Sequence, residues 1–215
     1  MNKRGKTKRY SINYELVYGK KIKSRPRMKL RKPKLMMNGH TNEMFTPDYA
    51  INPLLPYLDK SKVIWDCAYG EGHLAKHFRD LGFKVIGNTK LDFINDDYNF
   101  IECDIIITNP PYSIKDKFLE RCYYWNKPFA LLMPLTALEG QKRGKLYKEN
   151  GIQLLIPNRR INFITPNKGK SSWFQTAWFC YRLDLPQDLM FVELKTGGVF
   201  TQAPQDKTEV QPPNK

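Results

Sequence analysis

The chain has 215 residues and a formal net charge of +15, from 36 Lys and Arg residues against 21 Asp and Glu residues. Its length suits one domain with a hydrophobic core of its own, and 41% hydrophobic and 13% aromatic residues exclude a chain that is disordered throughout. No apolar stretch is long enough to span a bilayer, and no apolar segment of a secretory signal follows the basic N-terminus.

The positive charge is concentrated in the first part of the chain. Residues 1–38 contain 14 basic residues and one acidic residue, whereas the rest contains 22 basic and 20 acidic residues. Basic side chains that neutralise phosphates release counterions, so such a segment favours binding to nucleic acid, although a solvated tail has the same composition. We therefore predict a basic, flexible N-terminal arm over 1–40, a folded domain over 41–200 and a disordered tail over 201–215.

The spacing of cysteines and histidines predicts neither disulfides nor a metal site. The four cysteines form no CxxC pair and have no disulfide-like spacing, which is typical of reduced, buried thiols in an intracellular protein. They are Cys67, Cys103, Cys122 and Cys180. His73 and His77 lie four residues apart, as zinc ligands on a helix would, but no third ligand is evident. We expect packed or solvent-facing histidines and a cytoplasmic protein, in the cytoplasm of a host cell if the protein is viral.

Apolar periodicity predicts alternating helices and strands. Thr46 followed by Pro47 predicts the start of a helix that runs to about Leu58. The later elements, in chain order, are a strand at 63–66, a helix at 72–81, strands at 84–87 and 104–108, a helix at 114–125 capped by Ser113, a strand at 128–134, a helix at 137–150, and strands at 152–157 and 176–183. This alternation predicts an α/β fold with a mostly parallel, doubly wound sheet and a C-terminal antiparallel hairpin. Four basic residues are expected on solvated helix faces: Arg121, Lys142, Arg143 and Lys145.

The first candidate site follows the strand predicted at 63–66. Asp66 ends this strand, and Gly70 and Gly72 follow before a helix begins. The glycines let the backbone turn tightly and approach a ligand, and a helix N-terminus offers free N–H groups. The third glycine of a dinucleotide site is missing, and so is the lysine of a phosphate-binding loop. Since a carboxylate disfavours phosphate, the loop favours a cationic ligand.

The second candidate site follows the strand predicted at 104–108. The sequence there is Asn109-Pro110-Pro111-Tyr112. The prolines fix φ and remove two backbone donors, which leaves the Asn109 side-chain oxygen and the Pro110 carbonyl as acceptors beside the Tyr112 ring. Two acceptors beside a flat aromatic face favour a planar group that carries an NH2. The alternative is a proline-rich turn with a tyrosine at the surface.

With these residues the chain resembles the S-adenosylmethionine-dependent amino-methyltransferases, whose signature is (D/N/S)-P-P-(Y/F/W), and specifically the phage-type DNA N6-adenine methyltransferases. The resemblance covers about residues 42–183, and its elements are Phe45-Thr46-Pro47, the loop from Asp66 to Gly72, and Asn109 to Tyr112. It implies a Rossmann-like class I methyltransferase fold, the cofactor S-adenosylmethionine, and transfer of a methyl group to the exocyclic N6 amine of adenine in DNA.

The resemblance, together with the basic loop that precedes the last predicted strand, assigns roles to individual residues. Catalytic roles fall to Asn109, Pro110 and Tyr112. Cofactor-binding roles fall to Phe45, Thr46, Pro47, Asp66, Ala68, Gly70, Gly72, Asn88, Asp92, Phe93 and Asn109. Substrate-binding roles fall to Pro111, Tyr112, Ser113, Arg159, Arg160, Lys168, Lys170 and Trp173. The usual acid at the end of the second strand, which binds the cofactor ribose, is missing. Asn88 or Asp92 could take this role, or Asp92-Phe93 could instead hold the cofactor's adenine.

The substrate class rests on charge. In the resembling superfamily the same signature serves enzymes that modify adenine or cytosine in DNA, adenine in RNA, and a protein glutamine. The basic arm and the basic loop favour a nucleic acid, with DNA favoured over RNA, and no membrane partner is expected. The alternatives are an RNA adenine-N6 methyltransferase, a DNA cytosine-N4 methyltransferase, and a catalytically inactive nucleic-acid-binding protein of the same fold. The sequence predicts no oligomeric state.

Overall fold

The computed structural model describes residues 44–90, 92–95, 101–165 and 174–195. The predicted arm and tail therefore lie outside the described residues. The elements in chain order, where η marks a short 3₁₀ turn, are η1 (Asp48–Ile51), η2 (Leu55–Tyr57), β1 (Val63–Trp65), α2 (His73–Asp80), β2 (Lys84–Ile86), β3 (Ile105–Thr108), η3 (Tyr112–Ile114), α3 (Lys115–Trp125), β4 (Phe129–Pro134), η4 (Leu135–Leu138), α4 (Gln141–Asn150), β5 (Gln153–Pro157), β6 (Thr176–Tyr181) and β7 (Leu189–Val192).

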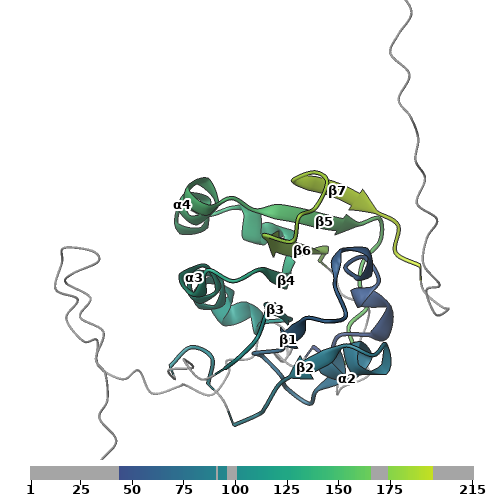
Figure 1. Ribbon diagram of the computed structural model, residues 1–215. Helices are drawn as coiled ribbons and strands as arrows, with labels where there is room; N and C mark the ends of the chain where they lie inside the picture. The colour runs from purple at the N-terminus through teal and green to yellow at the C-terminus, as the bar shows by residue number, and fades with distance from the viewer. Residues whose placement is uncertain (1–43, 91, 96–100, 166–173, 196–215) are drawn as a thin grey trace, which may run out of the picture. The chain divides into compact units, whose positions relative to one another are not determined.

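One sheet of seven strands organises these elements, in the order β2-β1-β3-β4-β6-β5-β7 (Figure 1). β1 pairs in parallel with β2 and β3, β3 with β4, and β5 with β7. β6 runs antiparallel between β4 and β5. This arrangement confirms the predicted α/β class, with a mostly parallel Rossmann-like sheet and an antiparallel pair near its C-terminal end.

The order of the strands also predicts where a ligand binds. From β1 the chain passes to β2 on one side and then crosses to β3 on the other side. The switch point of the sheet therefore lies between β1 and β3. In open α/β sheets ligands bind outside the carboxyl ends of the strands at such a point.

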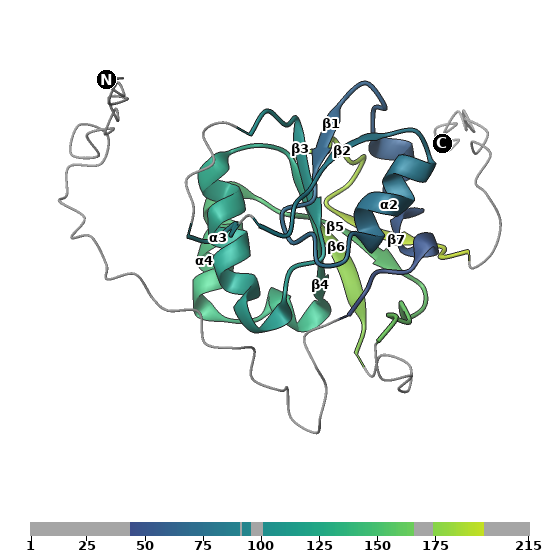
Figure 2. The ribbon, with the colours of Figure 1, turned by 90° about the horizontal axis from the view of Figure 1, so that it is seen from below.

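Helices cover both faces of the sheet, as Figure 2 shows, with α2 on one face and α3 and α4 on the other. The central strands β3, β4 and β6 are therefore buried along their whole length. Successive residues of a strand point to opposite faces. Ile107, Leu132 and Trp178 accordingly belong to the core on the α2 side, and Ile106, Leu131 and Phe179 to the core on the α3 side.

The long helix predicted from Thr46 to Leu58 is wrong. The chain forms two separate turns, η1 and η2, and no side chain caps the first. Pro53 and Pro56 lie within the predicted helix. Because proline has no N–H and clashes with the preceding turn, a continuous helix cannot pass through these positions.

Two later helices differ from prediction at their N-termini. Ser113 caps no helix, because it lies inside η3 and α3 begins at Lys115. The two prolines that precede Tyr112 direct the chain into this 3₁₀ turn, in which the Ile114 amide donates to the Pro111 carbonyl at 3.0 Å. The helix predicted over 137–150 is divided into η4 and α4, because Gly140 has a φ of +108°.

The sequence predicted no strand after residue 183, but β7 is present. It pairs with β5 at the edge of the sheet. Its residues alternate, since Met190 and Val192 pack against the core while Leu189 and Phe191 are exposed. This short alternating run is typical of a half-buried edge strand.

The described residues also bear on the expected thiols and on the membrane. All four cysteines are free and buried, as predicted. No helix in the described ranges is long and apolar enough to cross a bilayer.

Trp178→Phe tests the contact that fixes the N-terminal turns to the sheet. The Trp178 indole donates to the Ala50 carbonyl at 2.8 Å, and both residues are fully buried. We expect the substitution to lower the free energy of unfolding by about 2 kcal/mol, because it leaves a cavity and a buried carbonyl without its donor. Urea denaturation measures this, with Tyr124→Phe on the exposed face of α3 as the control. A Trp178→Phe protein as stable as the parent would contradict the expectation.

Candidate active site

The two predicted loops meet at the switch point between β1 and β3. The Thr108 hydroxyl, at the end of β3, donates to Asp66 Oδ1 at 2.7 Å. The same hydroxyl accepts from the Ala68 amide at 3.1 Å. One buried threonine therefore fixes both the carboxylate after β1 and the backbone of the glycine loop.

Asp66 has unusual electrostatics. Its side chain is buried, and burial raises the pKa of the carboxyl to about 6, although the Thr108 hydroxyl, the Ala68 amide and the charge of Arg79 oppose the shift. Among the described residues, Oδ2 has no hydrogen-bond partner. Buried polar atoms are almost always paired, so an unpartnered carboxylate oxygen indicates a site for a donor or a cation.

The glycine loop leads directly into α2. Gly72 has a φ of +82° and occupies the N-cap position of this helix. A Cβ at Gly72 would lie 2.5 Å from the Tyr69 hydroxyl, and a Cβ at Gly87 would lie 2.2 Å from Tyr69 Cδ2. The Tyr69 ring therefore packs between the loop and the end of β2. The sequence analysis did not predict this role of Tyr69. The glycine at position 87, at the end of a predicted strand, was the one sign that a side chain packs closely there.

Asn109 is oriented by a contact with a distant segment. Its Nδ2 donates to the Met44 carbonyl at 2.9 Å. This bond directs the amide nitrogen toward Met44 and leaves Oδ1 as the free end of the amide. Oδ1 is buried and has no partner among the described residues. The loop after β3 therefore presents an acceptor oxygen whose amide is held by Met44.

The segment Phe45-Thr46-Pro47 lies between α2 and the Asn109 loop. Phe45 forms a two-bond antiparallel bridge with Ile164, each bond 2.9 Å long. Its ring stacks on His73 with the centroids 4.6 Å apart, and the Thr46 carbonyl lies 3.0 Å from His77 Nε2, which donates to it. The two histidines are therefore packing residues, and no group of metal ligands occurs in the described part of the chain.

Tyr112 is a buried residue, which excludes the proline-rich turn with a surface tyrosine. Its ring meets Phe163 and Phe174 edge to face, at centroid distances of 6.3 and 5.6 Å. Its hydroxyl has no partner among the described residues, and burial raises the pKa of the phenol. We call Tyr112, Phe163 and Phe174 the aromatic cluster.

The three residues considered for the cofactor's ribose or adenine have local partners. The Asn88 side chain accepts from the Lys90 amide at 2.8 Å. Asp92 accepts from the Ile94 amide at 3.0 Å and from the Asn95 side chain at 2.6 Å. Phe93 is buried and stacks on Phe118 at 5.0 Å. The structure therefore places Asp92 and Phe93 in a compact turn against the core on the α3 side.

The other residues with a predicted catalytic or substrate-binding role fall into three groups. Arg159 and Arg160 are exposed and follow the carboxyl end of β5, at the same edge of the sheet as Asp66 and Asn109. Ser113 is exposed, Pro110 is buried and Pro111 is half-buried. Lys168, Lys170 and Trp173 lie outside the described residues.

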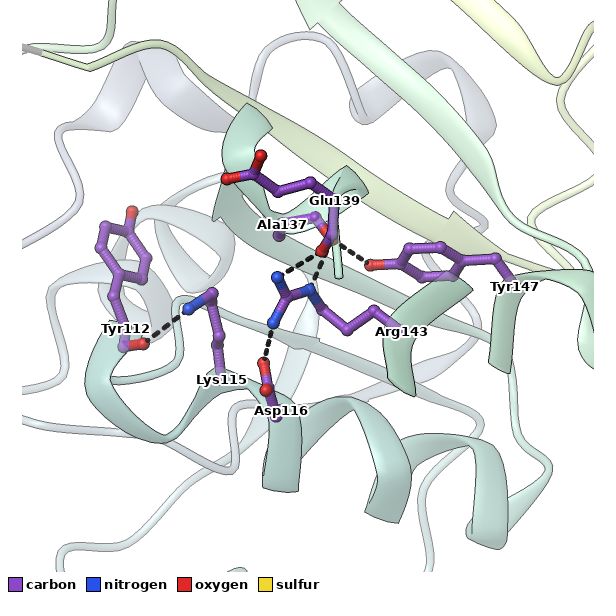
Figure 3. Close-up of polar contacts among 7 residues, drawn as sticks. All are labelled: Tyr112, Lys115, Asp116, Ala137, Glu139, Arg143 and Tyr147. Carbon is purple, nitrogen blue, oxygen red and sulfur yellow. Dashed lines mark hydrogen bonds and ion pairs between the residues drawn. The ribbon is translucent and has the colours of Figure 1, made fainter. Parts of the chain in front are cut away.

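Arg143 does not lie on a solvated helix face, contrary to the prediction. From α4 it donates to Asp116 Oδ1 at 2.6 Å, to the Ala137 carbonyl at 2.7 Å and to the Glu139 carbonyl (Figure 3). Its side chain is 14% exposed. Lys115, in the first turn of α3, donates to the Tyr112 carbonyl at 3.4 Å. Arg143 thus joins the turn after β4 to the start of α3, next to the Asn109–Tyr112 loop.

No protein-family model and no curated protein sequence matches the chain. Two solved structures have a similar fold at low identity. A protein from Listeria monocytogenes assigned as a class I S-adenosylmethionine-dependent methyltransferase is 13% identical over 72% of this chain and 67% of its own, with a TM-score of 0.47. The modification subunit assigned to a type I restriction enzyme of Vibrio vulnificus is 12% identical over 78% of this chain, with a TM-score of 0.44. The match spans about half of that subunit, 49% of its length.

Arg143→Lys tests the clamp between α3 and α4. Lysine can keep the ion pair with Asp116 but cannot reach three oxygens from a planar fork. We expect a loss of about 2 kcal/mol, or roughly 4–8 °C in Tm, because the Ala137 and Glu139 carbonyls lose the charged donor that joins them to Asp116. Thermal unfolding measures this, with Lys142→Met on the exposed face of the same helix as the control. Equal losses in the two variants would show that Arg143 has no special role.

Proposed function

We propose that the protein transfers a methyl group from S-adenosylmethionine to the N6 amine of adenine in DNA. The observation that carries this proposal is the Asn109 side chain, whose nitrogen is held by the Met44 carbonyl and whose buried oxygen has no partner. Such an oxygen can accept a hydrogen from an amine without first losing another bond. The contact with Met44 accounts for the amide nitrogen, but no contact among the described residues accounts for the oxygen.

The chemistry of the amine explains why acceptors are needed. The lone pair of an exocyclic amine on adenine is delocalised into the ring, which makes the nitrogen a poor nucleophile. Asn109 Oδ1 and the Pro110 carbonyl would accept its two hydrogens and turn the lone pair out of conjugation. They would also stabilise the positive charge that develops on nitrogen, since preorganised dipoles in a dry site stabilise charge strongly.

The residues of the glycine loop fit a cofactor with a cationic end. Asp66 Oδ2 is a buried carboxylate oxygen without a partner, and it would accept the α-ammonium group of the cofactor. Gly70, Gly72 and the segment Phe45-Thr46-Pro47 would lie along the same cofactor. When bound, S-adenosylmethionine supplies a methyl group on a positively charged sulfur. Asn88 and Asp92 remain the candidates for its ribose, with the partners described above.

Tyr112 would hold the target base. A base in a duplex must be extruded before its amine can reach Asn109. In the structure the Tyr112 ring is enclosed by Phe163 and Phe174. A base that stacks on Tyr112 would therefore take the place of one of these contacts.

The choice of DNA as substrate is supported by charge. The basic arm would supply a segment that binds phosphates. Arg159 and Arg160 are exposed and lie at the same edge of the sheet as Asn109. RNA would meet the same charges, so transfer to RNA is the main competing outcome of the test below. The retained acceptor at Asn109 and the retained carboxylate at Asp66 argue against an inactive protein.

Labelled-methyl transfer to duplex DNA, single-stranded DNA and RNA tests the proposal. The parent should label DNA adenine most efficiently, and Asn109→Ala should lower the rate at least about 100-fold because the acceptor is lost. Asn109→Asp should retain part of the activity, since it keeps an acceptor oxygen. Full activity in Asn109→Ala would refute the proposed role, and preference for RNA would refute the choice of substrate.

The pKa of Asp66 predicts a pH dependence of cofactor binding. The carboxyl is ionised above about pH 6 and becomes protonated below it. The dissociation constant of S-adenosylmethionine should therefore rise about tenfold between pH 7 and pH 5, because the ammonium group loses its ionised partner. Calorimetry measures this, and Asp66→Asn should bind weakly with no such dependence. An unchanged dissociation constant in the parent over this range would contradict the role of Asp66.

A further inference from the structure

We propose that the Thr176 hydroxyl binds a ring nitrogen of the target base and so fixes the purine in the site. The inference rests on the proposed function and adds a residue that neither the sequence motifs nor the resemblance indicated. Thr176 is the first residue of β6 and is 1% exposed. Its Oγ1 has no hydrogen-bond partner among the described residues.

The position of Thr176 in the sheet explains why the fold gives its hydroxyl no partner. The residue directly across on β4 is Pro134, whose ring offers neither a donor nor an acceptor. The backbone contact at this end of the two strands is made by the neighbours, since the Leu135 amide donates to the Gln175 carbonyl at 3.0 Å. Valine has nearly the same shape as threonine and favours strands equally. Packing therefore does not account for a hydroxyl at this position.

Thr176 lies at the same edge of the sheet as the candidate active site. Pro134 is the last residue of β4, which runs parallel to β3, so Thr176 pairs with the carboxyl end of β4 and lies at the same edge of the sheet as the carboxyl end of β3. Phe174 precedes Thr176 by two residues in the bend that leads into β6. Phe174 meets the Tyr112 ring at a centroid distance of 5.6 Å.

The same face carries the other parts of the site. Trp178 follows Thr176 by two residues, and Ile107 precedes Asn109 by two residues. Both Trp178 and Ile107 belong to the core on the α2 side. Phe163, which contacts Tyr112, packs against that core as well. The Thr176 hydroxyl and the Asn109 oxygen are therefore two buried polar atoms at the same edge of the sheet that have no partner among the described residues.

The chemistry of adenine assigns the hydroxyl a role. Asn109 Oδ1 and the Pro110 carbonyl are acceptors and match the amine. The ring nitrogens of adenine are acceptors and need a donor. A threonine hydroxyl is a donor, whereas the acceptors on the Asn109 side of the site cannot serve these nitrogens. Thr176 therefore supplies the complementary half of the recognition.

Thr176→Val and Thr176→Ser test the inference, with methyl transfer and thermal unfolding as the two measurements. Thr176→Val should be as stable as the parent or more stable, because it removes a buried polar atom without a partner. Its kcat/KM on adenine in DNA should nevertheless fall about tenfold, the effect of one lost hydrogen bond. Thr176→Ser keeps the hydroxyl and should stay within about twofold of the parent.

Oligonucleotides that contain 1-deaza-, 3-deaza- or 7-deazaadenine identify the nitrogen. One of the three should lower the kcat/KM of the parent about tenfold and should be methylated equally well by the parent and by Thr176→Val. The other two should retain the tenfold difference between the proteins. A uniform difference for all three analogues would overturn the inference.

The remaining outcomes also decide the matter. Parental activity in Thr176→Val would show that the hydroxyl does not touch the base. A valine variant less stable than the parent would show that the hydroxyl already has a partner in the fold, and would overturn the inference as well. A failure of the proposed function would be seen in a different experiment, in which the Asn109→Ala variant would still transfer the methyl group.

Discussion

The structure depends on the hydrogen bonds of one buried threonine at the carboxyl ends of β1 and β3. Thr108 accepts from the Ala68 amide and donates to Asp66, so the ends of two strands that are far apart in sequence become one rigid unit. Parallel strands need long crossover connections, and the chain places α2 and β2 in the connection between β1 and β3. Asn109 follows Thr108 directly. Because of this bond, the acceptor loop and the glycine loop hold a fixed position relative to each other.

A second constraint comes from the N-terminal side of the domain. Met44 orients the Asn109 amide, Phe45 stacks on His73, and Thr46 accepts from His77. The segment before η1 is thus held by residues of α2 and of the loop after β3. The orientation of the Asn109 amide therefore depends on a segment that is itself held by α2.

Sequence patterns predicted six of the seven strands and the sheet class, and missed only β7, because strands follow from local periodicity. They failed where distant residues decide the structure. The first helix is an exception, because the effect of Pro53 and Pro56 is local and the sequence itself should have ended the predicted helix there. No pattern in the sequence could show that Arg143 contacts Asp116 and the carbonyl of Ala137, because that contact depends on how α4 packs on α3. No sequence motif marks Thr176 either, because its burial depends on how β6 packs between β4 and β5.

The polar atoms that the fold leaves without partners lower the stability of the protein, so their presence needs an explanation other than stability. A buried carboxylate, amide or hydroxyl without a partner destabilises a fold, and an apolar residue of similar shape would remove that cost. Asp66 Oδ2, Asn109 Oδ1 and Thr176 Oγ1 are such atoms, and all three adjoin the carboxyl edge of the sheet. β4, by contrast, is built from apolar side chains that are buried along its whole length. Under the proposed function, a ligand that supplies a cation, an amine and a ring nitrogen would give these atoms their partners at the edge where α/β sheets bind ligands.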